Sequence, residues 1–428
     1  MDREEYVRRA AELVPVLRER APQAEALRHV PQETIDDLCR ADLFRGAVPE
    51  RFGGCGFDFD FILSVAAELG RGCGATAWCY SNWACPTWVV GMYPEQAQEE
   101  YWASGANTLC ASALNPTGAT SLTAVVGGYR LSGQWDFTSG CDAATWVLVL
   151  GAVPAGVLTF LVPRSDWVIH DTWFASGLRS TGSKDIVIDD AFVPEHRALL
   201  ATDLQEAHTP GRELHDTANY RIPLLSAVSY PLAAPMVGMV QGAVETFQAA
   251  MQHRTSALRG GQMAQLTGVQ MRLAEATREV EAARLIMHHD IHNILDRARR
   301  HATPTLEERL RARRNVAYVA TLCVRAMNRL FDGSGGYALF DASPLQRFHR
   351  DIHAASHHVS FSWDTASEQY GRVSWVLSRL TAGSERPCWW VMARPRLYGR
   401  HLRVPARHHP RQEPEEVADN MRPAQSSC

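Results

Sequence analysis

The chain has 428 residues, of which 46% are hydrophobic, and it carries 43 Lys and Arg against 47 Asp and Glu, a formal net charge of -4. A chain of this length and hydrophobic content can bury a large core in two or three domains. The near balance of charge excludes the strongly basic surface that nucleic acid or anionic lipid requires, so we expect small molecules and other protein chains as partners.

The first hundred residues predict helices. The opening MDREEYVRRAAELVPVLRER is charged at helical spacing and lacks the apolar stretch of a signal peptide. In FDFDFILSVAAELGR, Phe61, Val65 and Leu69 recur at i, i+4 and i+8, on one helix face. No run of about 18 apolar residues predicts a membrane span. We therefore expect an N-terminal helical domain over residues 1–105 of a cytoplasmic protein.

From about residue 107 the sequence changes to short β-prone segments separated by turns. The segment SLTAVVGGYRLSGQWDFTSG predicts a hairpin around Gly127 and Gly128, and ATWVLVLGAV, GVLTFLVP and DIVIDDAFVP follow it. We expect these segments to form a small central β-domain over residues 106–205.

Long helical patterns return after about residue 206. LLSAVSYPLAAPMVGMVQGAVETFQAAMQHR and MAQLTGVQMRLAEATREVEAARLIMHHDIHNILDRARR predict a C-terminal four-helix-bundle domain over residues 206–380. Residues 381–428 are rich in Arg, Pro and His without periodicity, which predicts a disordered tail. The expected fold class is α+β, mainly α, in the order helical domain, β-domain, helical bundle.

Several segments occur in a recognisable order: VPERFGG, FTSG, GLRSTGSKDIVIDDAFVPEHR, a long helix with EVEAARL, and GGYALFDASPLQRFHRD. On these segments the chain, from about residue 5 to 380, resembles the acyl-CoA dehydrogenase superfamily. Within it the chain most resembles the flavin-dependent two-component monooxygenases, the group D aromatic hydroxylases. The resemblance implies an acyl-CoA dehydrogenase-like fold, a flavin in the cleft between the β-domain and the bundle, and a homotetramer.

The resemblance also implies which residues lie nearest the flavin ring. Thr138 and Ser139 in WDFTSG match the segment beside the ring, where a hydroxyl can hydrogen-bond N5 or O4. Ser112 in CASALNP matches the strand end at the other edge of the ring. We therefore expect Thr138 and Ser112 among the catalytic residues, and Thr138 and Ser139 among those that bind the cofactor. For the Thr-Ser pair, ordinary turn residues after a strand are the competing interpretation.

A second group of residues is implied further from the ring. Arg179, Ser183 and Lys184 in GLRSTGSKD form a basic, hydroxyl-bearing turn near the substrate and phosphate side. Arg254, just after the first bundle helix, corresponds to the arginine that reaches a cofactor phosphate, often across the subunit interface. The alternatives are solvated loop charges for Arg179 and Lys184, and an ordinary helix-end cation for Arg254.

The residue that a dehydrogenase uses as its base is missing from the matching position. A dehydrogenase removes a proton next to a thioester carbonyl, so it needs a carboxylate over the flavin. When GGYALFDASPLQRFHRD is laid without a gap over the common dehydrogenase pattern, the glutamate position falls on Ala342. Asp341 is adjacent, and Glu275 or Glu281 on the long helix keep a dehydrogenase with a displaced base open as an alternative.

The segment that follows is rich in histidine. In the hydroxylase branch this region carries a histidine facing the reactive edge of the flavin, and AASHHVSFSWD offers His357 and His358. We favour His358 as the base that assists a phenolic substrate, with His353 and Asp364 as neighbours. His349, His353 and His357 also resemble a metal-binding ladder at i, i+4 and i+8. Such spacing without a placed third ligand arises often by chance, and the family supplies no metal, so we expect none.

One helix departs from the family pattern. Relatives that hydroxylate phenols commonly have a histidine in the region represented here by SNWACPTW, where this chain has Cys85, Pro86 and Thr87. The aromatic residues of the same region suit a planar substrate, although aromatic residues at helical spacing are more often core. They are Trp78, Tyr80, Trp83 and Trp88.

The sequence thus predicts an enzyme, the oxygenase component of a two-component flavin-dependent monooxygenase. Its cofactor would be reduced FMN or FAD, which diffuses from a separate flavin reductase because no nicotinamide domain is visible. Through a C4a-hydroperoxyflavin formed with O2, it would hydroxylate an aromatic, phenolic small molecule. GCGATA, residues 72–77, follows a helical segment and so predicts no dinucleotide-binding fold. A displaced-base dehydrogenase and a non-catalytic protein on the same scaffold are the alternatives.

Overall fold

The first quarter of the chain folds into helices, as predicted. The computed structural model describes residues 2–114, 120–153, 156–256 and 260–374, all within one unit, Met1–Ala382. In the fourth helix, the predicted face of Phe61, Val65 and Leu69 is fully buried. The helices are α1 (Arg3–Glu12), α2 (Val14–Leu27), α3 (Gln32–Arg40), α4 (Asp60–Gly70), α5 (Gly74–Val90) and α6 (Glu95–Trp102).

The middle of the chain forms two four-stranded sheets. One has the order β1-β4-β5-β8 and the other the order β2-β3-β7-β6, and the predicted hairpin is β2–β3, with Val125 paired to Gly128. Apolar side chains of both sheets form a second core of their own. The strands are β1 (Cys110–Ala113), β2 (Ser121–Val125), β3 (Gly128–Thr138), β4 (Trp146–Val153), β5 (Gly156–Pro163), β6 (Val168–His170), β7 (Lys184–Pro194) and β8 (Ala198–Leu200).

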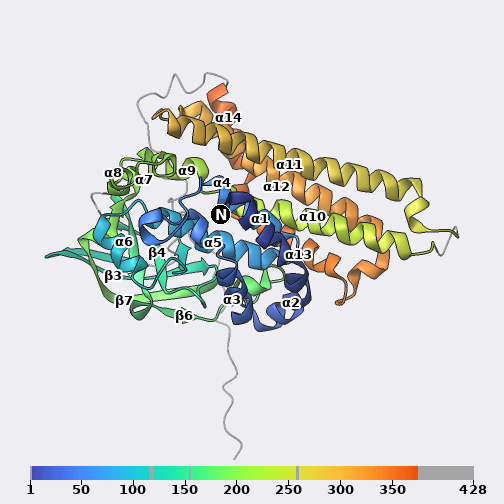
Figure 1. Cartoon of the computed structure of the whole chain (residues 1–428), viewed down its shortest axis with the longest axis horizontal. Helices are drawn as coiled ribbons and strands as arrows, with labels where there is room; N and C mark the ends of the chain where they lie inside the picture. The colour runs from blue at the N-terminus through green and yellow to red at the C-terminus, as the bar shows by residue number, and fades with distance from the viewer. Residues whose placement is uncertain (1, 115–119, 154–155, 257–259, 375–428) are drawn as a thin grey trace, which may run out of the picture. The chain divides into compact units, whose positions relative to one another are not determined.

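Helices return after the strands. Figure 1 shows the long helices α10, α11 and α12 running side by side, and α12 begins with a capping box between Thr305 and Glu308. The predicted tail at 381–428 lies outside the described residues, and the predicted domain boundaries stay predictions. The helices are α7 (Ala201–Glu206), α8 (Pro210–Leu214), α9 (Leu224–Ala227), α10 (Tyr230–His253), α11 (Thr267–Arg299), α12 (Leu306–Ser334), α13 (Pro344–Ser356) and α14 (Trp363–Ser374).

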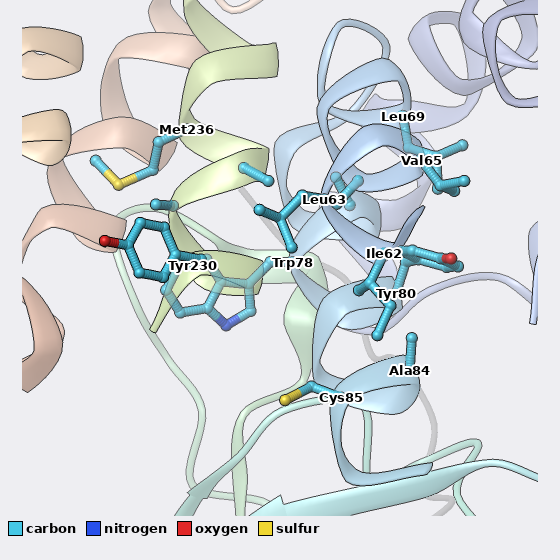
Figure 2. Packing of buried hydrophobic residues seen from close by; sticks show 14 of the residues in the cluster. Ile62, Leu63, Val65, Leu69, Trp78, Tyr80, Ala84, Cys85, Tyr230 and Met236 are labelled. Carbon is cyan, nitrogen blue, oxygen red and sulfur yellow. The ribbon is translucent and has the colours of Figure 1, made fainter. Parts of the chain in front are cut away.

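The main core lies where α4, α5 and α10 meet. Figure 2 shows Leu63 of α4 and Met236 of α10 among its side chains. The backbones approach closely, because a Cβ on Gly238 of α10 would lie 2.1 Å from the carbonyl oxygen of Ala67 on α4. The segment Leu224–His253 is long and apolar enough for a membrane span by length and composition, but 72% of its most apolar window is buried, as expected of a core helix.

Candidate functional site

Strand β3 ends in an irregular turn that buries Thr138. The pairing of β3 with β7 shifts register between Trp135 and Thr138, and Phe137 has a φ of 60°, a left-handed conformation that bulky residues rarely adopt. Thr138 is 0% exposed, and its Oγ1 has no hydrogen-bond partner among the described residues. Because a buried hydroxyl without a partner is costly, this atom indicates a place for a polar atom of a ligand.

The next residue, Ser139, belongs to a chain of hydrogen bonds. Its Oγ lies 2.8 Å from Ser183 Oγ, which in turn lies 2.6 Å from Thr181 Oγ1. Thr181 Oγ1 donates to the carbonyl oxygen of Leu178 at 2.8 Å, and the indole N–H of Trp78 on α5 donates to Ser139 Oγ at 3.2 Å. The structure thus brings two of the predicted residues, Ser139 and Ser183, into direct contact.

The loop that carries Ser183 is fastened to α13. The Asp351 carboxylate accepts a hydrogen bond from the backbone N–H of Leu178 at 2.6 Å. A Cβ on Gly177 would lie 2.1 Å from the carbonyl oxygen of Arg350, so the loop backbone lies directly on the helix. Burial raises the pKa of Asp351 to about 7, although the Leu178 N–H lowers it. The group that positions this loop therefore titrates near neutral pH.

His358 lies just after α13, at the start of the 3-10 turn Val359–Phe361. Its Nδ1 accepts a hydrogen bond from the backbone N–H of Ser360 at 3.2 Å, so the neutral ring carries its proton on Nε2. Burial lowers the pKa of His358 to about 4, which keeps the ring neutral at pH 7. The ring meets the Trp78 indole edge to face, with centroids 5.8 Å apart. Trp78 therefore contacts both His358 and Ser139.

The two cations expected in the GLRSTGSKD turn are placed differently from each other. Lys184 is nearly buried, and its Nζ pairs with the carboxylate of Asp142 at 2.6 Å. Arg179 is exposed in the 3-10 turn Arg179–Thr181. Lys184 is thus already neutralised within the chain, whereas the Arg179 side chain faces solvent.

Arg254 lies at the far end of α10. The start of α10 is near His358, because Ser229 Oγ donates to Ser360 Oγ at 3.0 Å. The 24 residues of α10 span about 36 Å at 1.5 Å per residue. At the other end, the guanidinium of Arg254 donates to the carbonyl oxygen of Ser334 at 2.7 Å and lies 4.6 Å from the ring centre of Tyr337. Arg254 is thus remote from the His358 turn of its own chain.

Two other predicted residues are not joined to this cluster. Ser112 is half-buried in β1, opposite Leu148 of β4, and the described contacts include no hydrogen bond from its hydroxyl to Ser139 or His358. Asp364 is exposed in the first turn of α14. Their predicted roles therefore gain no support from contacts within the chain.

Helix α5 presents Trp78 and Cys85 on one face, about two turns apart. Figure 2 shows both side chains extending from α5, with Tyr80 on the other side of the helix. Burial raises the pKa of the Cys85 thiol to about 12, so the position where the resemblance predicts a histidine holds a neutral group. Tyr80, Trp83 and Trp88 are fully buried and belong to the core. Of the four aromatic residues singled out in this helix, Trp78 is the one that contacts Ser139.

The positions considered for the base of a dehydrogenase lie on the surface. Ala342 and Asp341 are exposed before α13. Glu275 and Glu281 lie on α11, with side chains 47% and 55% exposed, each in an ion pair with an arginine. None of these carboxylates lies beside Ser139 or His358 in any described contact.

The histidines of α13 have local partners. The His349 ring stacks on Phe331 with centroids 4.1 Å apart, and His353 Nε2 lies 2.9 Å from the amide oxygen of Asn328. His357 is exposed, and its Nδ1 bonds to the carbonyl oxygen of His353. Within the described ranges, no group of three or more His, Cys, Asp or Glu side chains is arranged to hold a metal ion.

The residues around Thr138 fit the edge of a flavin ring. A flavin alternates N–H and C=O groups around a flat heterocycle, and the cluster offers the orphan hydroxyl of Thr138, the Ser139 hydroxyl and the flat indole of Trp78. Pockets for such ligands combine apolar walls with a few placed polar groups. Thr138, Ser139 and Trp78 are therefore the residues that would hold the ring, and His358 lies against Trp78.

Sequence reasoning missed three residues of this cluster. Thr181 lies inside the quoted GLRSTGSKD and Asp351 ends the quoted RFHRD, so their place in family motifs was an available signal. The third is Asp142, which pairs with Lys184 from 42 positions away, a separation that no spacing argument covers.

Two family models match the chain. One, described as the N-terminal domain of acyl-CoA dehydrogenase, matches residues 3–107, and the other, its C-terminal domain, matches residues 230–363. The chain is 33% identical over 365 residues to the flavin-dependent monooxygenase oxygenase subunit HsaA of Rhodococcus jostii, covering 84% of this chain and 95% of that protein. It is 34% identical to the oxygenase component of the FADH2-dependent resorcinol hydroxylase of a Rhizobium species, covering 86% and 93%.

A solved structure agrees with these relatives. The crystal structure of the 3-HSA hydroxylase from Rhodococcus sp. RHA1 superimposes with a TM-score of 0.83 at 32% identity and covers 87% of this chain and 97% of the other. The similarity therefore extends over nearly the whole length of the relative.

Proposed function

Because the chain belongs to the flavin-dependent monooxygenases of the acyl-CoA dehydrogenase superfamily, we propose that it hydroxylates a phenolic small molecule with reduced flavin and O2. The comparisons confirm the predicted fold, the oxygenase class and the use of reduced flavin. The named relatives are hydroxylases, and Glu275 and Glu281 lie exposed on α11, so the dehydrogenase alternative loses its support.

The observation that carries the proposal is the contact of Trp78 with both Ser139 and His358, next to the orphan hydroxyl of Thr138. Reduced flavin supplies the electrons for O2 activation and so makes an oxygen atom available to the substrate. The chain itself supplies buried hydroxyls that orient the ring, and the surrounding apolar core excludes water. A dry site of this kind favours oxygen transfer over loss of peroxide.

The hydrogen bond from Ser360 indicates whether His358 donates or accepts a proton toward the substrate. Because Nδ1 is occupied, Nε2 carries the proton and can donate a hydrogen bond to the oxygen of a phenolate. Such a bond stabilises the ionised substrate, whose ring is the better nucleophile. To act as the base predicted from the sequence, His358 would first have to give up the bond to Ser360.

The remaining partners are proposals that follow from the family. The relatives are named oxygenase subunit and oxygenase component, which supports a separate flavin reductase for this chain. We propose a homotetramer in which Arg254, remote from the His358 turn of its own chain, reaches the cofactor of a neighbouring subunit. A cytoplasmic location stays a prediction of the sequence.

The test is single-turnover oxidation of the reduced-flavin complex. The protein is loaded with FMNH2 or FADH2 without oxygen and mixed with ¹⁸O2 and a panel of simple phenols. We expect one labelled oxygen atom in a hydroxylated product. Complete return of the oxygen as hydrogen peroxide with every phenol, together with bleaching of oxidised flavin by an acyl-CoA, would overturn the proposal in favour of a dehydrogenase.

A further inference from the structure

The hydroxyl groups beside the proposed flavin edge form an unbranched chain with one proton each. It runs from Ser139 Oγ to Ser183 Oγ at 2.8 Å, and from Ser183 Oγ to Thr181 Oγ1 at 2.6 Å. Both contacts are short enough that a proton must lie between each pair of oxygens. The two ends of the chain determine which oxygen gives that proton.

At one end, Thr181 Oγ1 lies 2.8 Å from the carbonyl oxygen of Leu178, and a carbonyl can only accept, so Thr181 donates there. Its single proton is then used, and Ser183 must donate to Thr181. The single proton of Ser183 is then occupied as well, so Ser139 must donate to Ser183. At the other end, the indole of Trp78 can only donate, so Ser139 accepts from it.

The consequence is that the proton of Ser139 points to Ser183 and cannot be donated to a ligand. Ser139 keeps one lone pair for the ligand, whereas the neighbouring hydroxyl of Thr138 has no partner and keeps its proton available. The site thus combines an acceptor at Ser139 with a donor at Thr138. An acceptor distinguishes the two redox forms of a flavin, because N5 carries a hydrogen in the reduced ring and only a lone pair in the oxidised ring.

We propose that the hydroxyl chain from Ser139 through Ser183 to Thr181 holds Ser139 as a hydrogen-bond acceptor and thereby selects reduced over oxidised flavin. This inference rests on the proposed function and deepens it, since an oxygenase that takes diffusing flavin from a reductase gains from rejecting the oxidised form. Thr181 and Ser183 act as positioning residues through Ser139. The chain is anchored at Leu178, whose backbone N–H is held by Asp351.

The contact of Thr181 Oγ1 with the carbonyl oxygen of Leu178 disfavours the reverse order, in which each hydroxyl would donate toward Ser139. If Thr181 donated to Ser183, its oxygen would face the Leu178 carbonyl oxygen at 2.8 Å with no proton between them, and two oxygen lone pairs repel at that distance. Leu178 is held by Asp351 on one side, and its carbonyl oxygen also accepts from the indole N–H of Trp173 at 3.0 Å, so it is not free to turn away. The reverse order predicts the opposite effect in the experiment below.

The experiment measures binding constants and needs no turnover. Dissociation constants for FMNH2 and FMN, and for FADH2 and FAD, are determined by anaerobic titration of flavin fluorescence or absorbance with wild type, Thr181→Val and Thr181→Ser. Valine matches the shape of threonine but accepts no hydrogen bond, which frees Ser183 and then Ser139 to turn their protons toward the ligand. We expect the oxidised-to-reduced ratio of dissociation constants to fall about fivefold in Thr181→Val, the effect of one neutral hydrogen bond.

Thr181→Ser keeps the hydroxyl and should keep the wild-type ratio. An unchanged or larger ratio in Thr181→Val would overturn the inference while leaving the proposed function standing. Failure of the wild-type protein to bind either redox form would instead overturn the proposed function. If Thr181→Val does not fold, Ser183→Ala removes the acceptor of the Ser139 proton and is judged by the same ratio.

Discussion

The buried carboxylate of Asp351 accepts a hydrogen bond from the backbone N–H of Leu178 at 2.6 Å, and this contact ties α13 to the loop that carries Thr181 and Ser183. Leu178 has a φ of 50°, a left-handed conformation that a leucine adopts only under constraint. Asp351 therefore holds a strained backbone in place, and through it the order of the hydroxyls beside the site.

The first prediction concerns the pH dependence of stability in Asp351→Asn. Burial raises the folded-state pKa of Asp351 from its ordinary value of 3.8 to about 7. A raised carboxyl pKa means that the folded protein binds the proton more tightly, so this contribution is complete below about pH 4 and is lost as the pH rises through 7. Urea unfolding at pH 4.5, 6 and 7.5 should show the variant gaining stability relative to wild type as the pH rises.

Asp341→Asn is the matched control, because Asp341 is an exposed carboxylate ten positions earlier in the same segment. It should show no change relative to wild type across the same three pH values. If Asp351→Asn also kept a constant difference from wild type at all three, the carboxyl would not be titrating in this range.

The second prediction is that Thr138→Val raises stability but impairs function. Its Oγ1 is buried without a partner, so Thr138→Val removes an unsatisfied hydroxyl and keeps the shape of the side chain. The flavin-free protein should gain about 1 kcal/mol of unfolding free energy. The same change should weaken flavin binding and raise the fraction of O2 released as hydrogen peroxide, because a donor to the ring is lost. Thermal unfolding and a peroxide assay measure the two effects.

Thr87→Val is the control, and we expect it to lower the free energy of unfolding. Thr87 is also buried, but its hydroxyl donates to the carbonyl oxygen of Trp83 and bonds to the Tyr101 hydroxyl, both at 2.8 Å. Its removal should destabilise the protein by about 1 kcal/mol. Loss of stability in both variants would contradict the interpretation of Thr138 as an orphan group awaiting a ligand.

The sequence was sufficient for the fold, but not for the contacts between the residues of the candidate site. The order of helices and strands follows from local periodicity, and the hairpin at Gly127 and Gly128 from its turn residues. The contact of Ser139 with Ser183 depends on the pairing of β3 with β7 and on its shift in register, which no local pattern encodes. Local sequence thus predicts helices and strands better than it predicts which side chains meet.

The cations illustrate the same limit. Lys184 and Arg179 lie in one short turn and look alike as loop charges, yet Lys184 is nearly buried against Asp142 and Arg179 is exposed. Arg254 was expected at a cofactor phosphate, often across the subunit interface, and within one chain it lies at the end of α10 remote from His358. Tertiary pairing and the length of one helix decide these positions, and neither is visible in a single motif.

The third prediction tests the surface carboxylates. Glu275 and Glu281 lie on α11 in exposed ion pairs with arginines, where an exposed pair contributes little. Glu275→Gln and Glu281→Gln should therefore leave the rate and the yield of hydroxylated product within about twofold of wild type, the level expected of surface changes. A large loss in either variant, measured as product per reduced flavin oxidised, would return the displaced-base dehydrogenase to consideration.

The fourth prediction concerns the direction of the hydrogen bond at His358. If Nε2–H donates to a phenolate, His358→Gln preserves an N–H donor and His358→Leu does not. Hydrogen bonds to charged groups contribute about 1.5–3 kcal/mol, so His358→Leu should lose about ten- to a hundredfold in product formation relative to His358→Gln. Both variants should bind reduced flavin like wild type. Equal loss in the two variants would favour a proton-accepting base, since glutamine cannot take a proton.

His358 and Asp351 also make opposite contributions to stability over the same pH range. Burial lowers the folded-state pKa of His358 from 6.5 to about 4, so the unfolded chain binds the proton more tightly and this contribution is lost as the pH falls from about 6.5 to 4. The contribution of Asp351 has the opposite pH dependence, because its raised pKa makes the contribution grow as the pH falls. In wild type the two contributions to the pH dependence of stability offset each other. Each becomes measurable when the other group is removed. Relative to wild type, His358→Gln should gain stability as the pH falls from 7 to 4.5, and Asp351→Asn should lose it. The double variant should show neither trend, and the same trend in both single variants would contradict the assignment of the two groups.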